Sequence, residues 1–194
     1  MDTMGYTEFA DLWRKIPEYD DEFKAVFAVA FFTGARPEEI RRLQGKHIHR
    51  ERKDLIIRMQ GGVKGSRERL LVLPIMEESV AHLAEFADGL FPNQYVFPTM
   101  YRRKNVSSTW EYRVKKYGLL RKGHPIPEYF FRHNLIALIG ALGRTFEEAF
   151  LLPYYVQGKT PPMFRGTSMT HYFHNTQKMA ELYKRMVRKI IQST

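Results

Sequence analysis

Three basic residues and one tyrosine, spread along this chain, are of the types that bind and cleave a phosphodiester. The first is Arg36, in the segment TGARPEEI (33–40), where a buried helix gives way to the start of another. Backbone N–H groups point outward at a helix start, and together with a rigidly held guanidinium they favour a phosphate. Taken alone, Arg36 is better explained as an ordinary surface arginine at a helix cap.

Two further cations follow. Lys64 lies in the glycine-flanked turn GGVKGS (61–66), from which an ammonium can reach into a groove and donate a proton to a leaving oxygen. Most turn lysines only improve solubility. Arg132 lies in an otherwise apolar helical segment with Phe130, Phe131 and Leu135. Its burial is costly unless it meets an anion or a carboxylate, so a ligand role and a structural salt bridge both stay open.

The last segment of interest is Gln157-Gly158-Lys159, followed thirteen positions later by Tyr172 in SMTHYFH (168–174). A single tyrosine is nearly always a packing or hydrogen-bonding residue. Tyr172 gains interest only from the order in which the other three segments precede it.

The elements that must position these residues are mostly helical. Hydrophobic periodicity predicts a helix over 6–16, with Thr7 as N-cap, and a buried helix from 20–21 to 32 that ends at Gly34. Pro37 begins the next helix. Two β-prone runs at 55–59 and 70–73 flank the glycine-rich turn and predict a hairpin. Further helices are expected at about 76–88, 106–117, 129–142 and 175–192. The predicted fold class is therefore mainly α with a small antiparallel β-sheet (α+β).

Composition limits the partners. The 194 residues have 31 Lys and Arg against 21 Asp and Glu, a formal net charge of +10, and no repeat or linker divides them. Such a basic domain attracts a polyanion, most often nucleic acid and less often an anionic membrane surface. The absence of cysteine excludes disulfides and thiolate chemistry. Charged residues interrupt every apolar run, which argues against a membrane span.

Taken in order, these segments resemble the catalytic domain of the tyrosine recombinases, or phage-type integrases. Residues 33–40 look like the family's first arginine box, with Glu39 as the carboxylate that supports Arg36. Lys64 looks like the hairpin lysine, Arg132-His133 like the second arginine box, and Tyr172 like the nucleophile. The resemblance runs from about Tyr6 to the end of the chain.

Two positions depart from the family pattern. Tyr129 stands where the second box usually has histidine, and Lys159 stands where a Gly-His or Gly-Trp pair is usual. These changes look like those of the divergent integrases of archaeal viruses and plasmids. Tyr129 and Lys159 are therefore hypothetical members of the catalytic set.

The resemblance implies a site-specific recombinase or integrase that needs no metal, ATP or other cofactor. Tyr172 would attack the scissile phosphate and form a 3′-phosphotyrosyl link, Arg36 and Arg132 would clamp the non-bridging oxygens, and Lys64 would protonate the leaving 5′-oxygen. Self-association into a tetrameric synapse on double-stranded DNA is also implied. The chain is expected to be a single catalytic domain, 1–194, without an N-terminal DNA-clamping domain. A cytoplasmic or nucleoid location in the host cell is expected.

A basic window supplies the expected DNA contacts beyond the pocket, and it could equally be a solvated face. Its candidate DNA-binding residues are Arg102, Arg103, Lys104, Arg113, Lys115 and Lys116. The terminal helix, 175–192, has an apolar stripe that would dock either on a neighbouring protomer or on its own core.

Other functional classes compete. A metal-dependent nuclease needs converging carboxylates, whereas the acidic pairs here are adjacent in sequence and point apart on a helix. His47 and His49 would share one face of a strand, but no third zinc ligand is evident. The remaining alternative is a non-catalytic basic DNA-binding protein in which Tyr172 is inert.

Overall fold

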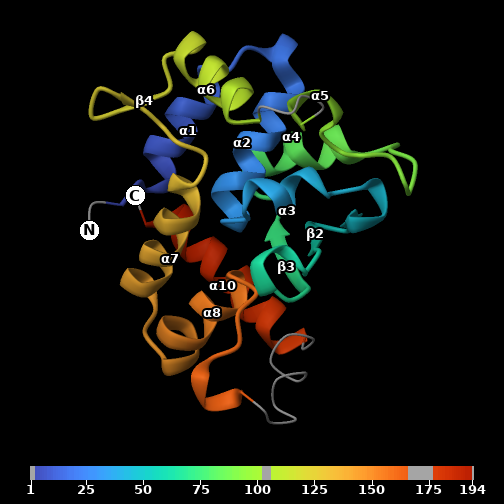
Figure 1. Cartoon of the computed structure of the whole chain (residues 1–194). Coiled ribbons are helices and arrows are strands. Elements are labelled where there is room, and N and C mark those ends of the chain that lie inside the picture. Colours follow the sequence, from blue (N-terminus) through green and yellow to red (C-terminus); the bar gives the residue numbers. More distant parts are fainter. Residues whose placement is uncertain (1–2, 102–105, 166–176, 194) are drawn as a thin grey trace.

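The computed structural model of the chain describes residues 3–101, 106–165 and 177–193, apart from the side chains of 63, 101 and 106–108. Helices form most of the fold, and one three-stranded sheet lies against them (Figure 1). The helices are α1 (Tyr6–Arg14), α2 (Asp21–Thr33), α3 (Pro37–Arg41), α4 (Glu78–Ala87), α5 (Pro98–Tyr101), α6 (Val106–Lys116), α7 (Phe130–Leu142), α8 (Leu152–Val156) and α10 (Gln177–Gln192).

The shorter helical turns join these helices, and the strands of the described residues form two sheets. The 3-10 turns are η1 (Glu18–Asp20), η2 (Gly45–His47), η3 (Val63–Gly65) and η5 (Pro162–Phe164), and η4 (Glu147–Leu151) is a π-helix that runs into α8. The strands are β1 (Ile48–Glu51), β2 (Asp54–Met59), β3 (Arg69–Pro74), β4 (Leu120–Arg121) and β5 (His124–Pro125).

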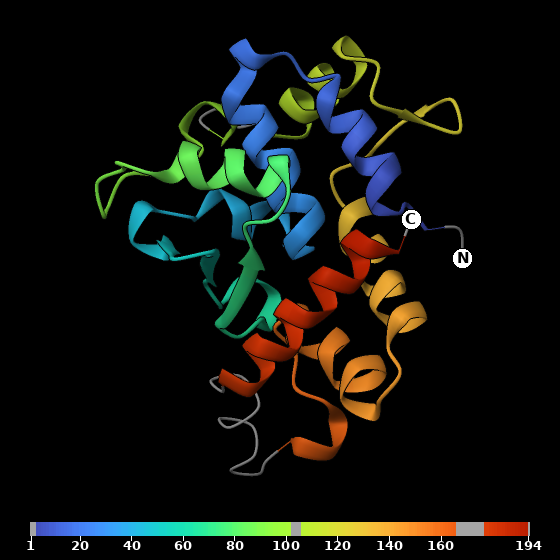
Figure 2. The ribbon, with the colours of Figure 1, turned by 180° about the vertical axis from the view of Figure 1, so that it is seen from behind.

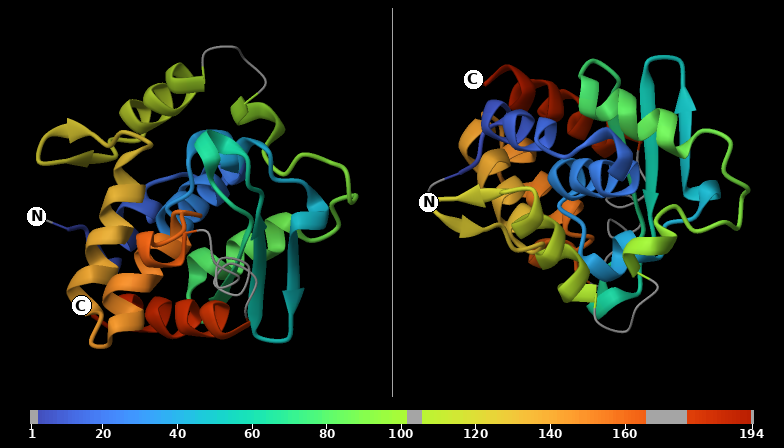
Figure 3. Two further views of the ribbon diagram at one scale, coloured as in Figure 1. Left: turned by 60° about the horizontal axis from the view of Figure 1, so that its bottom comes forward. Right: turned by 90° about the horizontal axis from the view of Figure 1, so that it is seen from above.

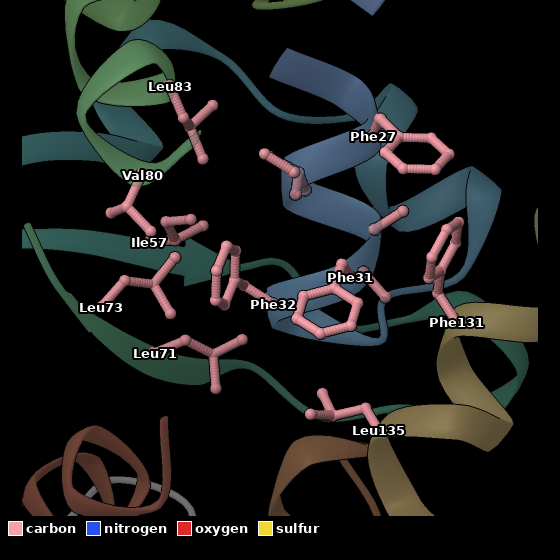
Figure 4. Close-up of a cluster of buried hydrophobic side chains, with 14 of the residues drawn as sticks. Phe27, Phe31, Phe32, Ile57, Leu71, Leu73, Val80, Leu83, Phe131 and Leu135 are labelled. Atoms are coloured by element: carbon pink, nitrogen blue, oxygen red, sulfur yellow. The ribbon is translucent and has the colours of Figure 1, made fainter. Parts of the chain in front are cut away.

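Helix α2 is the centre of the fold because it is apolar on nearly every side. All residues from Phe23 to Thr33 are buried, and α1, α4 and α7 pack around them. Phe31 and Phe32 lie between the sheet and α7, among the buried side chains shown in Figure 4. A helix buried all round has fixed ends, so the residues that follow it are also held in place.

The main sheet is an antiparallel meander in the order β1-β2-β3. Ile57 pairs with Leu71 and Met59 with Arg69, so the β2–β3 hairpin closes around the loop that carries Lys64. Leu55, Ile57 and Met59 alternate inward along β2, as the period of two requires. The hairpin thus anchors its loop to the core through its apolar face.

Helix α10 packs on the chain's own core. It crosses the back of the molecule against β3, α7, α1 and α8, as Figure 2 shows. Its buried face includes Leu182, Tyr183, Met186 and Ile190, and the Tyr183 hydroxyl donates a hydrogen bond to the carbonyl of Phe32. Of the two dockings that the sequence allowed for this helix, the structure has the intramolecular one.

The predicted elements are present with shifted ends, and several details were wrong or missed. Thr7 does not cap α1, because Gly5 holds that position and provides no side chain. Helix α10 begins at Gln177 among the described residues, and the predicted start at 175 lies outside them. Apart from the strand considered for His47 and His49, the edge strand β1, the small β4–β5 hairpin (left in the first view of Figure 3) and the helical segment 147–156 were not predicted. The first two are short, and Pro153 obscured the helical periodicity of the third.

Candidate active site

The junction between α2 and α3 brings the two predicted arginine segments together. Gly34 ends α2 in the left-handed conformation, with φ +53°. A Cβ there would lie 3.1 Å from a methyl carbon of Leu135 and 3.4 Å from the Cα of Arg132. Glycine is therefore favoured by the left-handed backbone, and a Cβ there would also press on the Leu135 side chain of α7. As a result, Arg36 and Arg132 lie near one another although 96 positions separate them in sequence.

Glu39 is the carboxylate at the centre of this junction. Its Oε2 accepts a hydrogen bond from the Arg36 amide at 2.8 Å, which caps α3. Three guanidiniums surround its oxygens: Arg69 donates two hydrogen bonds at 3.2 and 3.0 Å, Arg36 Nη1 lies 3.5 Å away, and Arg132 Nη1 lies 3.9 Å away. Burial acts to raise the pKa of Glu39, but Arg69 and the Arg36 amide outweigh it and the pKa is lowered. Glu39 is therefore ionised at neutral pH.

Arg69 is a member of the cluster that the sequence interpretation missed. The family resemblance implies that Glu39 supports Arg36. In the structure, the side chain that binds both oxygens of Glu39 is that of Arg69. Arg69 is 1% exposed at the start of β3, directly before the apolar run 70–73. That position was the available signal, since Arg69 has the same inward orientation as Leu71 and Leu73.

Arg132 is buried at the start of α7 and is held by the backbone. Its Nη1 donates to the carbonyl of Gly34 at 3.0 Å and its Nη2 to the carbonyl of Gln157 at 3.1 Å. These bonds occupy two of the five N–H groups of a guanidinium. Burial and the charge of Arg36 lower the pKa of Arg132 to about 10, partly offset by Glu39. The guanidinium remains charged at neutral pH in a positive field.

The cluster has an excess of positive charge. Arg36, Arg69 and Arg132 are all buried, and Glu39 is the carboxylate among the described residues that contacts them. Arg36 Nη1 is itself buried and has no hydrogen-bond partner in the described part of the chain. A buried guanidinium is stable when an anion or a carboxylate meets it. This arrangement therefore suits a dianionic or monoanionic group with several acceptor oxygens, such as a phosphate.

The hairpin and the segment around Lys159 are joined next to this cluster. The Arg67 amide donates to the carbonyl of Gly158 at 2.7 Å, and the Tyr155 hydroxyl bonds the backbone of Leu70. A Cβ on Gly158 would lie 2.8 Å from the Arg67 carbonyl oxygen, so a side chain is excluded there. Lys64, with φ +48°, and Lys159 are both exposed. The two lysines thus lie on segments that are bonded to each other and, through Gln157, to Arg132.

Tyr129 directly precedes α7 and is 40% exposed. Partial burial and the Glu38 carboxylate raise the pKa of Tyr129, while Arg36 and Arg132 oppose that rise. Its hydroxyl is therefore protonated at neutral pH and within electrostatic reach of the cluster.

The structure thus brings together Arg36, Arg132, Tyr129 and the segments that carry Lys64 and Lys159. Tyr172 lies outside the described residues, as do Arg102, Arg103 and Lys104, so their predicted roles stay predictions.

The basic residues of α6 are of two kinds. Lys115 and Lys116 are exposed, and Lys115 pairs with Glu111 one turn earlier at 2.6 Å. Arg113 instead binds Asp20 at 3.0 Å and lies over the ring of Phe23. Because Arg113 binds another part of this chain, it anchors α6, and this weakens its predicted role in DNA binding.

The histidine pair of the metal interpretation does not share a strand. His47 is in η2, where its Nδ1 accepts the Gln44 amide at 3.1 Å, and His49 is in β1. Among the described residues, the group with metal-ligand spacing is Glu18, Asp21 and His82, which has no link to the arginines. Asp21 begins α2 and Gly34 follows its end, about 20 Å apart at the rise of an α-helix.

No protein-family model matches the chain, and no curated protein matches it in sequence. Solved structures do match it. Against a XerH site-specific recombinase bound to its difH substrate, in a pre-cleavage complex, the TM-score is 0.56 at 17% identity, over 93% of this chain and 49% of that one. A XerA recombinase gives a TM-score of 0.56 at 18% identity, over 95% of this chain and 65% of that one.

A post-cleavage XerH complex with palindromic difH gives a TM-score of 0.55 at 16% identity, over 98% of this chain and 51% of that one. The chain therefore has the fold of a tyrosine recombinase catalytic domain, and it spans 49% to 65% of these recombinase chains. None of the helices in the described residues has the length and apolar character of a membrane span.

Proposed function

We propose that this chain is the catalytic domain of a site-specific DNA recombinase of the integrase type, which cleaves and rejoins DNA through Tyr172. The observation that carries the proposal is the excess charge of the arginine cluster, with the buried Arg36 Nη1 lacking a described hydrogen-bond partner. Phosphoryl transfer needs positioning and charge neutralisation more than covalent help, and fixed guanidiniums supply both.

In the proposed reaction, the Tyr172 oxygen attacks phosphorus and the bond from phosphorus to the 5′-oxygen breaks. The phenolic proton passes to solvent water, and the exposed Lys64 ammonium donates a proton to the leaving 5′-oxygen. Arg36 and Arg132 bind the non-bridging oxygens, and Lys159 and Tyr129 add hydrogen bonds. The phosphotyrosine retains the energy of the phosphodiester, so a second 5′-hydroxyl reverses the step without ATP.

Two features support DNA as the substrate. The chain has a net charge of +10, and the exposed Lys115 and Lys116 add positive charge on α6. The matching XerH structures are DNA complexes of site-specific recombinases. Integration into a host replicon and assembly of a tetramer on DNA are part of the proposal.

The test is a covalent adduct. The protein is incubated with labelled duplex DNA from the element that encodes it, nicked near the presumed crossover, in the presence of a chelator. A band that survives denaturing electrophoresis, is lost in Tyr172→Phe and is kept in the matched variant Tyr112→Phe supports the proposal. DNA binding without any adduct would contradict it and favour a non-catalytic DNA-binding protein.

A further inference from the structure

A hollow lies next to the arginine cluster, on the side of α3 that faces α6. Its volume is about 530 Å³, and α3, α6 and the segment before α7 contribute its walls. The apolar part consists of Pro37, Trp110, Pro125, Ile126 and Pro127. This volume exceeds that of a nucleobase several-fold, so a flat heterocycle fits within it together with water.

Acidic side chains outnumber basic ones in the lining of this hollow, in contrast to the cluster. The described residues that line it include three carboxylates, Glu38, Glu111 and Glu128, and one guanidinium, Arg41. Such a lining suits a phosphate less well than the arginine cluster does. A neutral ring with an N–H donor is favoured instead, because carboxylates accept hydrogen bonds from the amino groups of bases.

Glu38 supplies the specific acceptor. Its Oε2 is buried and has no hydrogen-bond partner in the part of the chain that the structure describes. A buried acceptor without a donor is costly, and a donor from a ligand would remove that cost. In contrast, Glu111 is exposed and already pairs with Lys115.

The hollow and the cluster share a border. Pro37 and Glu38 directly follow Arg36, and Tyr129 lines the hollow three residues before Arg132. A nucleotide has its phosphate and its base joined through one sugar, so a phosphate on the arginines places the attached base beside this opening. Taking a base out of the stack costs a few kcal/mol, which contacts with a pocket for that base can offset.

Resting on the proposed function, we propose that this hollow binds an unstacked nucleobase next to the scissile phosphate, with Glu38 accepting a hydrogen bond from its exocyclic amino group. The site favours cytosine over thymine, because thymine has a carbonyl oxygen where cytosine has the amino group.

The test measures binding of small probes by equilibrium dialysis: deoxycytidine monophosphate, thymidine monophosphate and deoxyribose 5-phosphate. The wild-type chain is expected to bind the cytidine nucleotide about tenfold more tightly than the other two, the value of one hydrogen bond to a charged group. Glu38→Gln should remove this preference without weakening deoxyribose phosphate. The matched variant Glu111→Gln should keep it.

Equal affinities for the three probes in the wild-type chain would overturn the nucleobase site and leave the phosphate cluster standing. If the wild-type chain binds none of the three probes, including deoxyribose phosphate, this result would count against the proposed function itself.

The chain has two tryptophans, so Trp13→Phe leaves Trp110 as a fluorescent reporter in the wall of the hollow. Quenching of Trp110 by the cytidine nucleotide supports the location. Quenching by a short arginine-containing peptide and not by the nucleotides would overturn the proposal in favour of a peptide site.

Discussion

Two basic regions of this molecule hold their charges in different ways. In the arginine cluster, Arg36, Arg69 and Arg132 are buried, and Glu39 and backbone carbonyls fix two of them by hydrogen bonds. On α6, Lys115 and Lys116 are exposed, and the pair of Lys115 with Glu111 has more than half of each side chain in solvent. Exposed pairs of this kind contribute little to stability.

The difference concerns preorganisation. The cluster has incurred the cost of desolvation during folding, so an incoming phosphate meets guanidiniums that need little further ordering. The lysines of α6 keep their solvation and freedom, which suits contacts that vary along a DNA backbone. We therefore expect the cluster to determine the rate of cleavage and the α6 lysines to determine the salt dependence of binding.

The largest effect is expected from Arg36→Ala. This substitution removes the guanidinium whose Nη1 has no hydrogen-bond partner among the described residues. The rate of DNA cleavage should fall by about 10²–10³-fold, which is the usual cost of losing a fixed donor to the transition state. Single-turnover cleavage under chelator measures it. As a matched control, Arg113→Ala should leave the cleavage rate nearly unchanged and lower the free energy of unfolding by about 1.5–3 kcal/mol, since Arg113 binds Asp20. An equal drop in cleavage in both variants would remove the distinction between the two regions.

The next effect concerns stability. Glu39→Gln leaves three buried guanidiniums without their carboxylate, and the free energy of unfolding at pH 7 should fall by about 3–5 kcal/mol. Because the pKa of Glu39 is lowered on folding, its contribution is present above the ordinary value of 4.5 and is lost as the pH falls through the folded pKa. Urea denaturation at several pH values should therefore show the two proteins converging in acid. A constant difference down to acid pH would contradict this account of Glu39.

A smaller effect tests the close approach that joins the lysine segments. Gly158→Ala places a Cβ 2.8 Å from the Arg67 carbonyl oxygen at φ +65°, whereas Gly118→Ala has φ +62° and nothing within 4 Å. Both variants incur the left-handed backbone cost of about 1–2 kcal/mol. Only Gly158→Ala adds a clash of about 1–3 kcal/mol and disturbs the position of Lys159. Thermal denaturation of the two variants side by side isolates the clash, and equal destabilisation would mean that the close approach is unimportant.

The smallest effect is expected on α6. Lys115→Ala and Lys116→Ala should each weaken DNA binding modestly and reduce the slope of log affinity against log salt by about one for each phosphate that is no longer neutralised. Titrations at several salt concentrations measure the slope. If neither variant changes it, this face of α6 does not lie on the DNA backbone.

Much of this arrangement could be predicted from the sequence, because the decisive features were local. The glycine at 34 ended a uniformly apolar helix, and Pro37 began the next, so the position of Arg36 followed from capping rules. The hairpin around Lys64 followed from two β-prone runs and a glycine-rich turn. The helical segment of Arg132 followed from its apolar neighbours.

Long-range pairings could not be predicted in the same way. Nothing local indicates that Arg69 binds Glu39 thirty positions earlier, that Arg132 reaches the carbonyl of Gln157, or that Arg113 binds Asp20. These pairings depend on the packing of α3 near β3, of α7 near the end of α8, and of α6 near η1. The order of the motifs indicated the members of the site, and tertiary packing decided which arginine anchors and which one stays available.

The most direct measurement of the central claim is to locate the DNA adduct on the protein. After incubation with nicked DNA, nuclease digestion and proteolysis, mass spectrometry should find the nucleotide remnant on the peptide that contains Tyr172, although the chain has 11 tyrosines. The remnant should also be strongly reduced in Arg36→Ala. A remnant on another residue, or an undiminished yield in Arg36→Ala, would contradict the assignment of the arginine cluster and Tyr172 to one active site.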